Sequence, residues 1–179
     1  MPRHKLGAAF AAGLAALLAA SVARAEILLE GVHWQAAAGV PAALRFQDVA
    51  GLRLAGGVVK SRVRARVRVR NASPVSREGI LLRYSVAARL SPASAPAEAG
   101  EKTAWAVPFI VEEKRVPRIG AQQTIEASLD PTTILRLYAA RVRRAGYRIL
   151  GLRLQVMVEP HRGEQRDIQT LESVVKVTE

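Results

Sequence analysis

Five arginines at every second position form the clearest candidate binding surface in this sequence. They alternate with small aliphatic residues and are Arg62, Arg64, Arg66, Arg68 and Arg70. A period of two places alternate side chains on opposite faces of a β-strand, with neighbours on one face about 7 Å apart. Because guanidinium groups form paired hydrogen bonds with carboxylates and phosphates, the strip is suited to a repeating anion. Two alternatives stay open: facing strands supply Asp or Glu partners, or the strip is only the solvated side of a half-buried sheet.

Residues that support catalysis are few. Beyond residue 25 the histidines are His33 and His161, which stand far apart. The chain has no cysteine, which excludes disulfides, thiolate nucleophiles and sulfur-based zinc sites. It also lacks a His-x-x-x-His pair, a Gly-x-Ser-x-Gly elbow and a Gly-rich phosphate loop. Glu112 and Glu113 precede two basic residues, which is typical of a mixed-charge turn. We therefore expect a protein that is not an enzyme, and we predict neither a cofactor nor a metal site.

The charge of the chain bears on its partners. Without the first 25 residues, 24 Lys and Arg remain against 15 Asp and Glu, an excess of nine positive charges. A basic surface favours anionic partners such as lipid headgroups or acidic polysaccharide. An arginine-rich and alanine-rich composition of the whole chain is the alternative explanation. Nucleic acid is not expected, because aromatic residues make up only 4% of the chain and few are present to stack on bases.

Strand patterns separated by turn signals occupy most of the chain after residue 25. Besides the arginine strand in 58–71, we predict strands at 26–35, within 42–54, and at 80–90, 105–111, 124–129, 150–158 and 168–177. We expect 80–90 to pair with the arginine strand, and the last two strands to form a hairpin. Residues 91–100 and 112–120 are predicted to be a surface loop and a charged turn, because both contain proline.

One helix interrupts the strands. Asp130 and Pro131 are typical of a helix start, and Gly146 of a left-handed helix end. The apolar stripe between them consists of Ile134, Leu135, Tyr138 and Val142. The sequence therefore predicts an all-β fold: a single β-sandwich of about seven or eight antiparallel strands with one crossing helix near 131–145.

Three segments resemble the immunoglobulin and fibronectin type III modules of exported bacterial proteins. They are the strand ending in Val67-Arg68-Val69-Arg70-Asn71, the strand around Trp105, and the helix that runs into Ala145-Gly146-Tyr147. The resemblance implies an immunoglobulin-like architecture for most of the chain and no particular activity. It also implies that Tyr147 anchors a corner through its hydroxyl. The chain departs from the pattern by lacking a cysteine pair and by having a longer helix at that corner.

The first 25 residues have the pattern of a signal peptide. Arg3 and Lys5 precede an apolar run at 6–20, and Ala23-Arg24-Ala25 offers the small residues of a cleavage site. We expect cleavage after Ala25, which leaves residues 26–179 as one sandwich domain without a transmembrane segment. A retained membrane anchor is the alternative, although the run is barely as long as the roughly 20 residues that a spanning helix needs. The expected location is the periplasm or the outside of the cell.

These observations predict an exported, non-enzymatic binding or accessory module of the cell envelope. We expect it to dock a protein partner through a sheet edge or its basic face. One alternative is a binder of anionic glycan or lipid that uses the arginine strand. The other is a periplasmic enzyme whose active site carries no recognisable motif.

Overall fold

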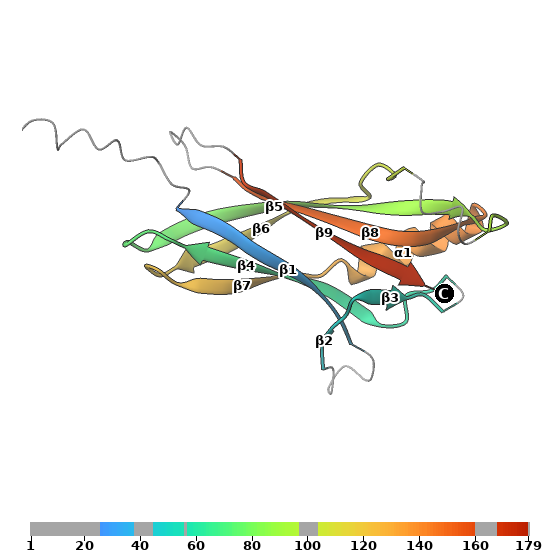
Figure 1. Cartoon of the computed structure of the whole chain (residues 1–179), viewed down its shortest axis with the longest axis horizontal. Helices are drawn as coiled ribbons and strands as arrows, with labels where there is room; N and C mark the ends of the chain where they lie inside the picture. Colours follow the sequence, from blue (N-terminus) through green and yellow to red (C-terminus); the bar gives the residue numbers. More distant parts are fainter. Residues whose placement is uncertain (1–25, 38–44, 56, 97–103, 160–167, 179) are drawn as a thin grey trace, which may run out of the picture.

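Two β-sheets packed face to face form the body of the protein (Figure 1). The computed structural model describes residues 26–37, 45–55, 57–96, 104–159 and 168–178. The first sheet has the order β2-β1-β4-β7 and the second the order β3-β9-β8-β5-β6. Their bounds are β1 Ile27–Ala37, β2 Gln47–Asp48, β3 Gly51–Arg53, β4 Arg62–Asn71, β5 Arg77–Pro92, β6 Ile110–Ile119, β7 Thr124–Leu129, β8 Tyr147–Val158 and β9 Thr170–Thr178, with helix α1 at Thr132–Arg144. The prediction of an all-β sandwich with one helix is confirmed.

The core lies between the sheets and is built by alternation along the strands. In β4 the four aliphatic residues between the arginines are at most 2% exposed. Alternate residues of β5 and β8 meet them from the second sheet, among them Leu82, Val86, Leu154 and Val156. Burial of these side chains provides the main stabilisation of a chain that has no disulfide. In β8, Ile149 is buried in place of the expected Leu150, because the register with β5 shifts between Arg89 and Leu90.

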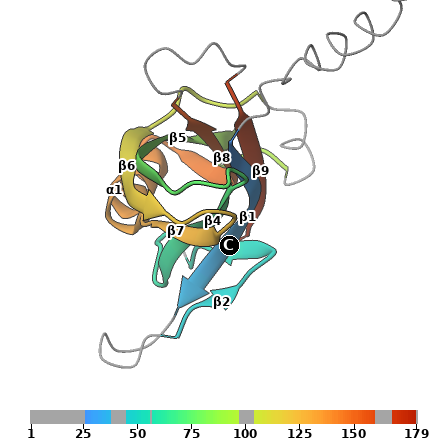
Figure 2. The ribbon, with the colours of Figure 1, turned by 90° about the vertical axis from the view of Figure 1, so that its left-hand side faces the viewer.

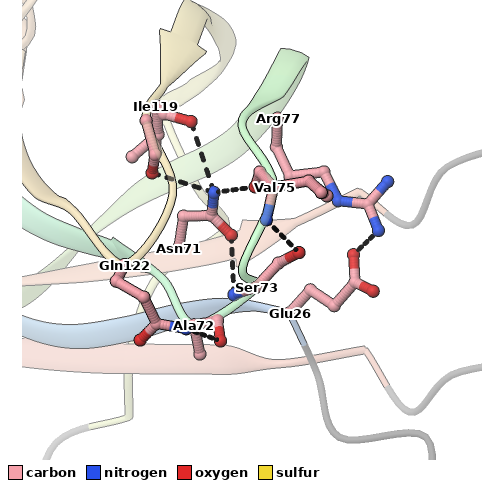
Figure 3. A network of polar contacts seen from close by, with 9 residues as sticks. Glu26, Asn71, Ala72, Ser73, Val75, Arg77, Ile119 and Gln122 are labelled. Atoms are coloured by element: carbon pink, nitrogen blue, oxygen red, sulfur yellow. Dashed lines mark hydrogen bonds and ion pairs between the residues drawn. The ribbon is translucent and has the colours of Figure 1, made fainter.

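The arginine strand does not pair with the strand that follows it. β4 lies between β1 and β7, whereas β5 lies between β6 and β8 in the other sheet. The prediction that they are neighbours was wrong because the connection between them crosses from one sheet to the other. The side chain of Asn71, which is fully buried, holds this crossing in place (Figure 3).

The amide of Asn71 joins two connections at one end of the sandwich. Its Nδ2 donates to the carbonyl oxygens of Val75 at 2.8 Å and Gly120 at 2.9 Å. Its Oδ1 accepts from the backbone N–H of Ser73 at 2.9 Å (Figure 3). The crossing between β4 and β5 is thereby bonded to the turn after β6, which brings the chain back to the first sheet.

The edge strand β6 begins and ends later than expected. Ile110 is buried, whereas Val107 is 84% and Val111 is 77% exposed, so the predicted alternation in 105–111 was wrong. The predicted charged turn at 112–120 is most of β6 itself, paired along one side with β5. Its charged residues face solvent at a sheet edge. Proline has no backbone N–H, and Pro117 is tolerated in such a strand because no further strand among the described residues pairs with its open side.

Two further departures concern strand pairing. β5 continues through Ser91 and Pro92, which pair with the first residues of β8, so the predicted loop begins later. Within 42–54 the chain forms the two very short strands β2 and β3, and β3 pairs with β9 in parallel. The other pairings are antiparallel, as predicted, and β8 and β9 form the expected hairpin.

Helix α1 packs against β8 and β4 and occupies the side of the sandwich where β6 and β7 lie, opposite β1 and β9 (Figure 2). Asp130 Oδ1 accepts the backbone N–H of Thr132 at 3.0 Å, and Gly146 adopts the expected left-handed conformation with φ +79°. The rings of Phe109 and Tyr138 stack with their centroids 4.0 Å apart. This contact ties the segment before β6 to the helix.

Candidate functional site

The five arginines of β4 point out from the first sheet, and most have partners on that face. Arg62 pairs with Asp130 at 3.1 Å, Arg70 with Glu30 at 3.6 Å, and Arg66 with Glu126. Arg64 donates to Gln35 Oε1 at 2.7 Å, and its guanidinium lies 3.7 Å from the ring centroid of Phe46. Arg68 makes no ion pair with any described residue. Strands β1 and β7 and the residue that follows β7 thus supply acidic partners for three of the five arginines, whereas Arg64 and Arg68 have no acidic partner among the described residues.

Two groups on this face have shifted pKa values. Burial and the neighbouring charge of Arg66 lower the pKa of Arg64. Burial on its own would raise the pKa of Asp130, but hydrogen bonds from Thr132 and the charge of Arg62 outweigh it and lower that pKa. Asp130 is therefore held in its charged form between α1 and the arginine strand.

Tyr147 lies at the start of β8, as the resemblance implied, but its side chain is 45% exposed. Its hydroxyl makes no hydrogen bond within the described part of the chain. Among those residues Tyr147 therefore forms no corner contact. Its ring is instead available at the surface, beside the end of α1.

Glu112 and Glu113 have separate structural partners. The hydroxyl of Tyr84 donates to Glu112, and burial together with this hydrogen bond raises the pKa of Tyr84. Glu113 accepts from Arg83 Nε at 3.0 Å on the other face of the sheet. The two carboxylates therefore do not act as a pair, and they lie on strand β6 rather than in a turn.

A shallow cleft of about 310 Å³ runs between β1 and β9, where the two sheets approach each other. It is lined by Val32, His33, Trp34, Asp48, Val49, Ala50, Ser173, Val174 and Val175. His33, Asp48 and Ser173 are of types used in acyl transfer, but no hydrogen bond joins any two of them. Asp48 Oδ1 instead accepts from the Gln35 amide at 2.7 Å.

His161 lies outside the described residues, and within them no group of three or more His, Asp or Glu is placed to hold a metal ion.

The most distinctive surface lies on the second sheet and centres on Trp105. The backbone of Trp105 bridges Arg89 on β5, and its indole reaches across to β8. A β-carbon on Gly151 would stand 3.6 Å from the indole Cη2, so the ring lies over this glycine. The guanidinium carbons of Arg89 and Arg153 lie 4.6 and 5.0 Å from the ring centroid. These distances are typical of cation–π contacts.

Strand β9 extends this surface. Lys176 is the cross-strand partner of Gly151, and Val174 is the partner of Arg153. Val174 is 51% exposed and also lines the cleft between β1 and β9. We call the set Arg89, Trp105, Gly151, Arg153, Val174 and Lys176 the Trp105 site.

Sequence reasoning missed the Trp105 site because its members come from four separate segments. One signal was present: Gly151 lies inside a strand pattern, and a glycine there often marks a close approach by another group. Nothing in the sequence indicated that the group would be the indole of Trp105.

Comparisons with known proteins give little further guidance. No family model matches the chain, and no curated protein matches it. A solved structure described as a crystal structure of a protein from Archaeoglobus fulgidus is similar, with 14% identity and a TM-score of 0.35. The similarity covers 84% of this chain and 98% of the archaeal one. At that score it carries no argument about this protein.

Proposed function

We propose that this chain is a non-enzymatic binding module of the cell envelope that docks a partner protein through the Trp105 site. The observation that carries the proposal is the indole of Trp105, held over Gly151 between two guanidinium groups on an outward sheet face. Tryptophan and arginine are the residues most enriched at the energetic centres of protein interfaces. A ring already fixed in position loses little conformational freedom when it binds.

The charge around Trp105 favours an acidic partner. Arg153 and Lys176 make no ion pair with any described residue, and they flank the indole on the side toward β9. The exposed side chain of Val174 adds an apolar contact beside them. A partner surface with an apolar centre and carboxylates at its rim would complement this arrangement.

The strand order supports an immunoglobulin-like module. If β1, β4 and β7 are taken as strands A, B and E, the second sheet reads G-F-C-C′ as β9-β8-β5-β6. This is the order in which immunoglobulin-type sandwiches arrange the corresponding strands, with C′ added to the C-F-G sheet. Such modules commonly serve as binding domains, which is in keeping with the proposed role.

Export is the second part of the proposal and rests on the signal-peptide pattern of residues 1–25, which lie outside the described residues. In the part of the chain that the structure covers, no helix is long and apolar enough to cross a membrane. N-terminal sequencing of the protein recovered from a periplasmic fraction tests the proposal. Export predicts a chain that begins at Glu26, whereas an intact N-terminus retained in the cytoplasm would contradict it.

Crosslinking in cells tests the docking surface. A photoreactive amino acid at Val174 is expected to capture a discrete partner protein, whereas the same group at Val75, which is 55% exposed, is not. Val75 lies in the crossing between β4 and β5, at the other end of the sandwich (Figure 1). Equal capture from both positions would contradict docking at the Trp105 site.

The captured partner then allows a quantitative test. Trp105→Ala is expected to weaken binding of the purified partner about 30-fold or more, in the range of an interface hot spot. Arg68→Ala serves as a control, because it removes an unpaired arginine from the first sheet. If Trp105→Ala binds like the unchanged protein while its unfolding temperature is also unchanged, the Trp105 site is not the docking surface.

A further inference from the structure

The solvent face of α1 carries an apolar residue and two arginines in one line. Leu137, Arg141 and Arg144 are spaced four and three residues apart, which places them on the same side of a helix. Leu137 is 68% exposed, an unusual exposure for a leucine on a helix whose opposite side is well buried. Tyr147, 45% exposed, follows directly after the left-handed turn at Gly146. We call Leu137, Arg141, Arg144 and Tyr147 the helix-end surface.

Positive charge gathers around the helix-end surface. Residues 131–158 contain six arginines and neither Asp nor Glu. Arg53, at the end of β3, and Lys176, near the end of β9, belong to the same end of the sandwich (Figure 1). The carboxylate of Asp130, which lies just before α1, is paired with Arg62 at 3.1 Å.

At the opposite end of the sandwich, acidic residues are paired with arginines, so positive and negative charges balance there. Glu26 and Glu30 lie at the start of β1, Glu78 at the start of β5, and Glu159 directly after β8. These strand starts lie at one end of the sandwich. Ile27, at the start of β1, pairs with Asn71 at the end of β4, and Arg77, at the start of β5, pairs with Ile119 at the end of β6. The described charges are therefore unevenly distributed along the long axis of the sandwich, and the helix end is its positive pole.

We propose that the helix-end surface docks on the surface of a membrane rich in anionic lipid headgroups. The arginines complement the headgroup phosphates, whose negative surface potential attracts basic side chains. Leu137 and Tyr147 favour a bilayer over a soluble polyanion. An exposed leucine gains by entering the boundary between headgroups and acyl chains, and tyrosine is enriched at that depth. In this orientation the helix lies against the lipid, and the end of the sandwich whose charges are paired points away from it.

Vesicle binding tests the proposal. The protein is mixed with vesicles of phosphatidylcholine alone or of phosphatidylcholine and phosphatidylglycerol in equal parts, and the bound fraction is measured by sedimentation. We expect binding only to the anionic vesicles. Arg141→Gln combined with Arg144→Gln should weaken it about 25-fold, because a basic residue near an anionic surface contributes roughly a factor of five. Arg68→Gln combined with Arg70→Gln removes the same charge far from the helix and should weaken binding much less.

A second variant separates a bilayer from a soluble polyanion. Leu137→Ser combined with Tyr147→Ser should lose most binding to anionic vesicles and keep its retention on a heparin column, because the arginines remain. All variants carry the same N-terminus as the parent protein, and circular dichroism establishes that they are folded. The proposal is overturned if anionic vesicles do not bind the parent protein or if the control pair weakens binding as much as the helix pair. Unchanged vesicle binding by the Leu137 and Tyr147 variant would also overturn it in favour of a general anion site.

Discussion

The indole of Trp105 lies directly over Gly151, a residue 46 positions later in the chain. A β-carbon there would stand 3.3 Å from the carbonyl oxygen of Val175 and 3.6 Å from the indole, so the larger branches of a valine would overlap the ring. The small size of this residue thus allows the aromatic centre of the proposed docking surface to lie close to β8.

Gly151→Val is expected to displace the indole of Trp105 into solvent. The measurement is the tryptophan emission spectrum, from which the spectrum of a matching Trp105→Phe variant is subtracted to remove the signal of Trp34. The Trp105 emission should shift to longer wavelength. Ser85→Val, on the same sheet face, is the control and should leave the spectrum unchanged. An unshifted spectrum in Gly151→Val would show that the ring does not depend on this glycine.

Asn71→Ala is expected to destabilise the protein by about 2–4 kcal/mol. The substitution leaves the partly buried carbonyl oxygens of Val75 and Gly120 and the buried one of Ile119 without their donor, and unsatisfied buried groups cost about 1–3 kcal/mol each. Urea unfolding measures the change. Gln155→Ala removes an exposed amide that donates to Glu172, and it should change the stability by no more than about 0.5 kcal/mol. Equal effects of the two variants would contradict the structural role of Asn71.

Asp130 should contribute stability that acid removes. Its pKa is lowered in the folded protein, so the charged form is favoured on folding. The contribution is complete above the unfolded pKa of about 3.9 and is lost as the pH falls through the folded value. The free energy of unfolding of the parent protein should therefore exceed that of Asp130→Asn at neutral pH, and the difference should shrink toward pH 2. Arg62→Gln should reduce this difference, and a difference that grows in acid would contradict the sign.

The ion pair between Arg66 and Glu126 should contribute little to stability. Both side chains are partly exposed, at 34% and 41%, and exposed pairs contribute about 0–1 kcal/mol. A double-mutant cycle with Arg66→Gln and Glu126→Gln measures the coupling free energy, which should fall further at high salt. A coupling above about 2 kcal/mol would show that the arginine strip stabilises the sheet far more than its exposure implies.

The sequence by itself determined the local structure of the arginine strand and of the helix. Alternation in β4 specified a strand with aliphatic residues on one side and arginines on the other, because the period of two follows from backbone geometry alone. Asp130, the apolar stripe and Gly146 likewise located α1 to within a residue at either end. Such features depend on neighbours in the chain, so a single sequence contains them in full.

Only the tertiary structure decided which strands pair and which side chains meet. The chain crosses to the other sheet between β4 and β5, and the amide of Asn71 bonds this crossing, although so short a connection is also compatible with a hairpin. Glu30, Glu126 and Asp130 pair with three arginines of a strip for which the sequence left the presence of acidic partners open, and Trp105 meets Gly151 across two strands. These contacts join residues that are distant in the chain, and strand register sets them through packing and hydrogen bonding that no local pattern encodes.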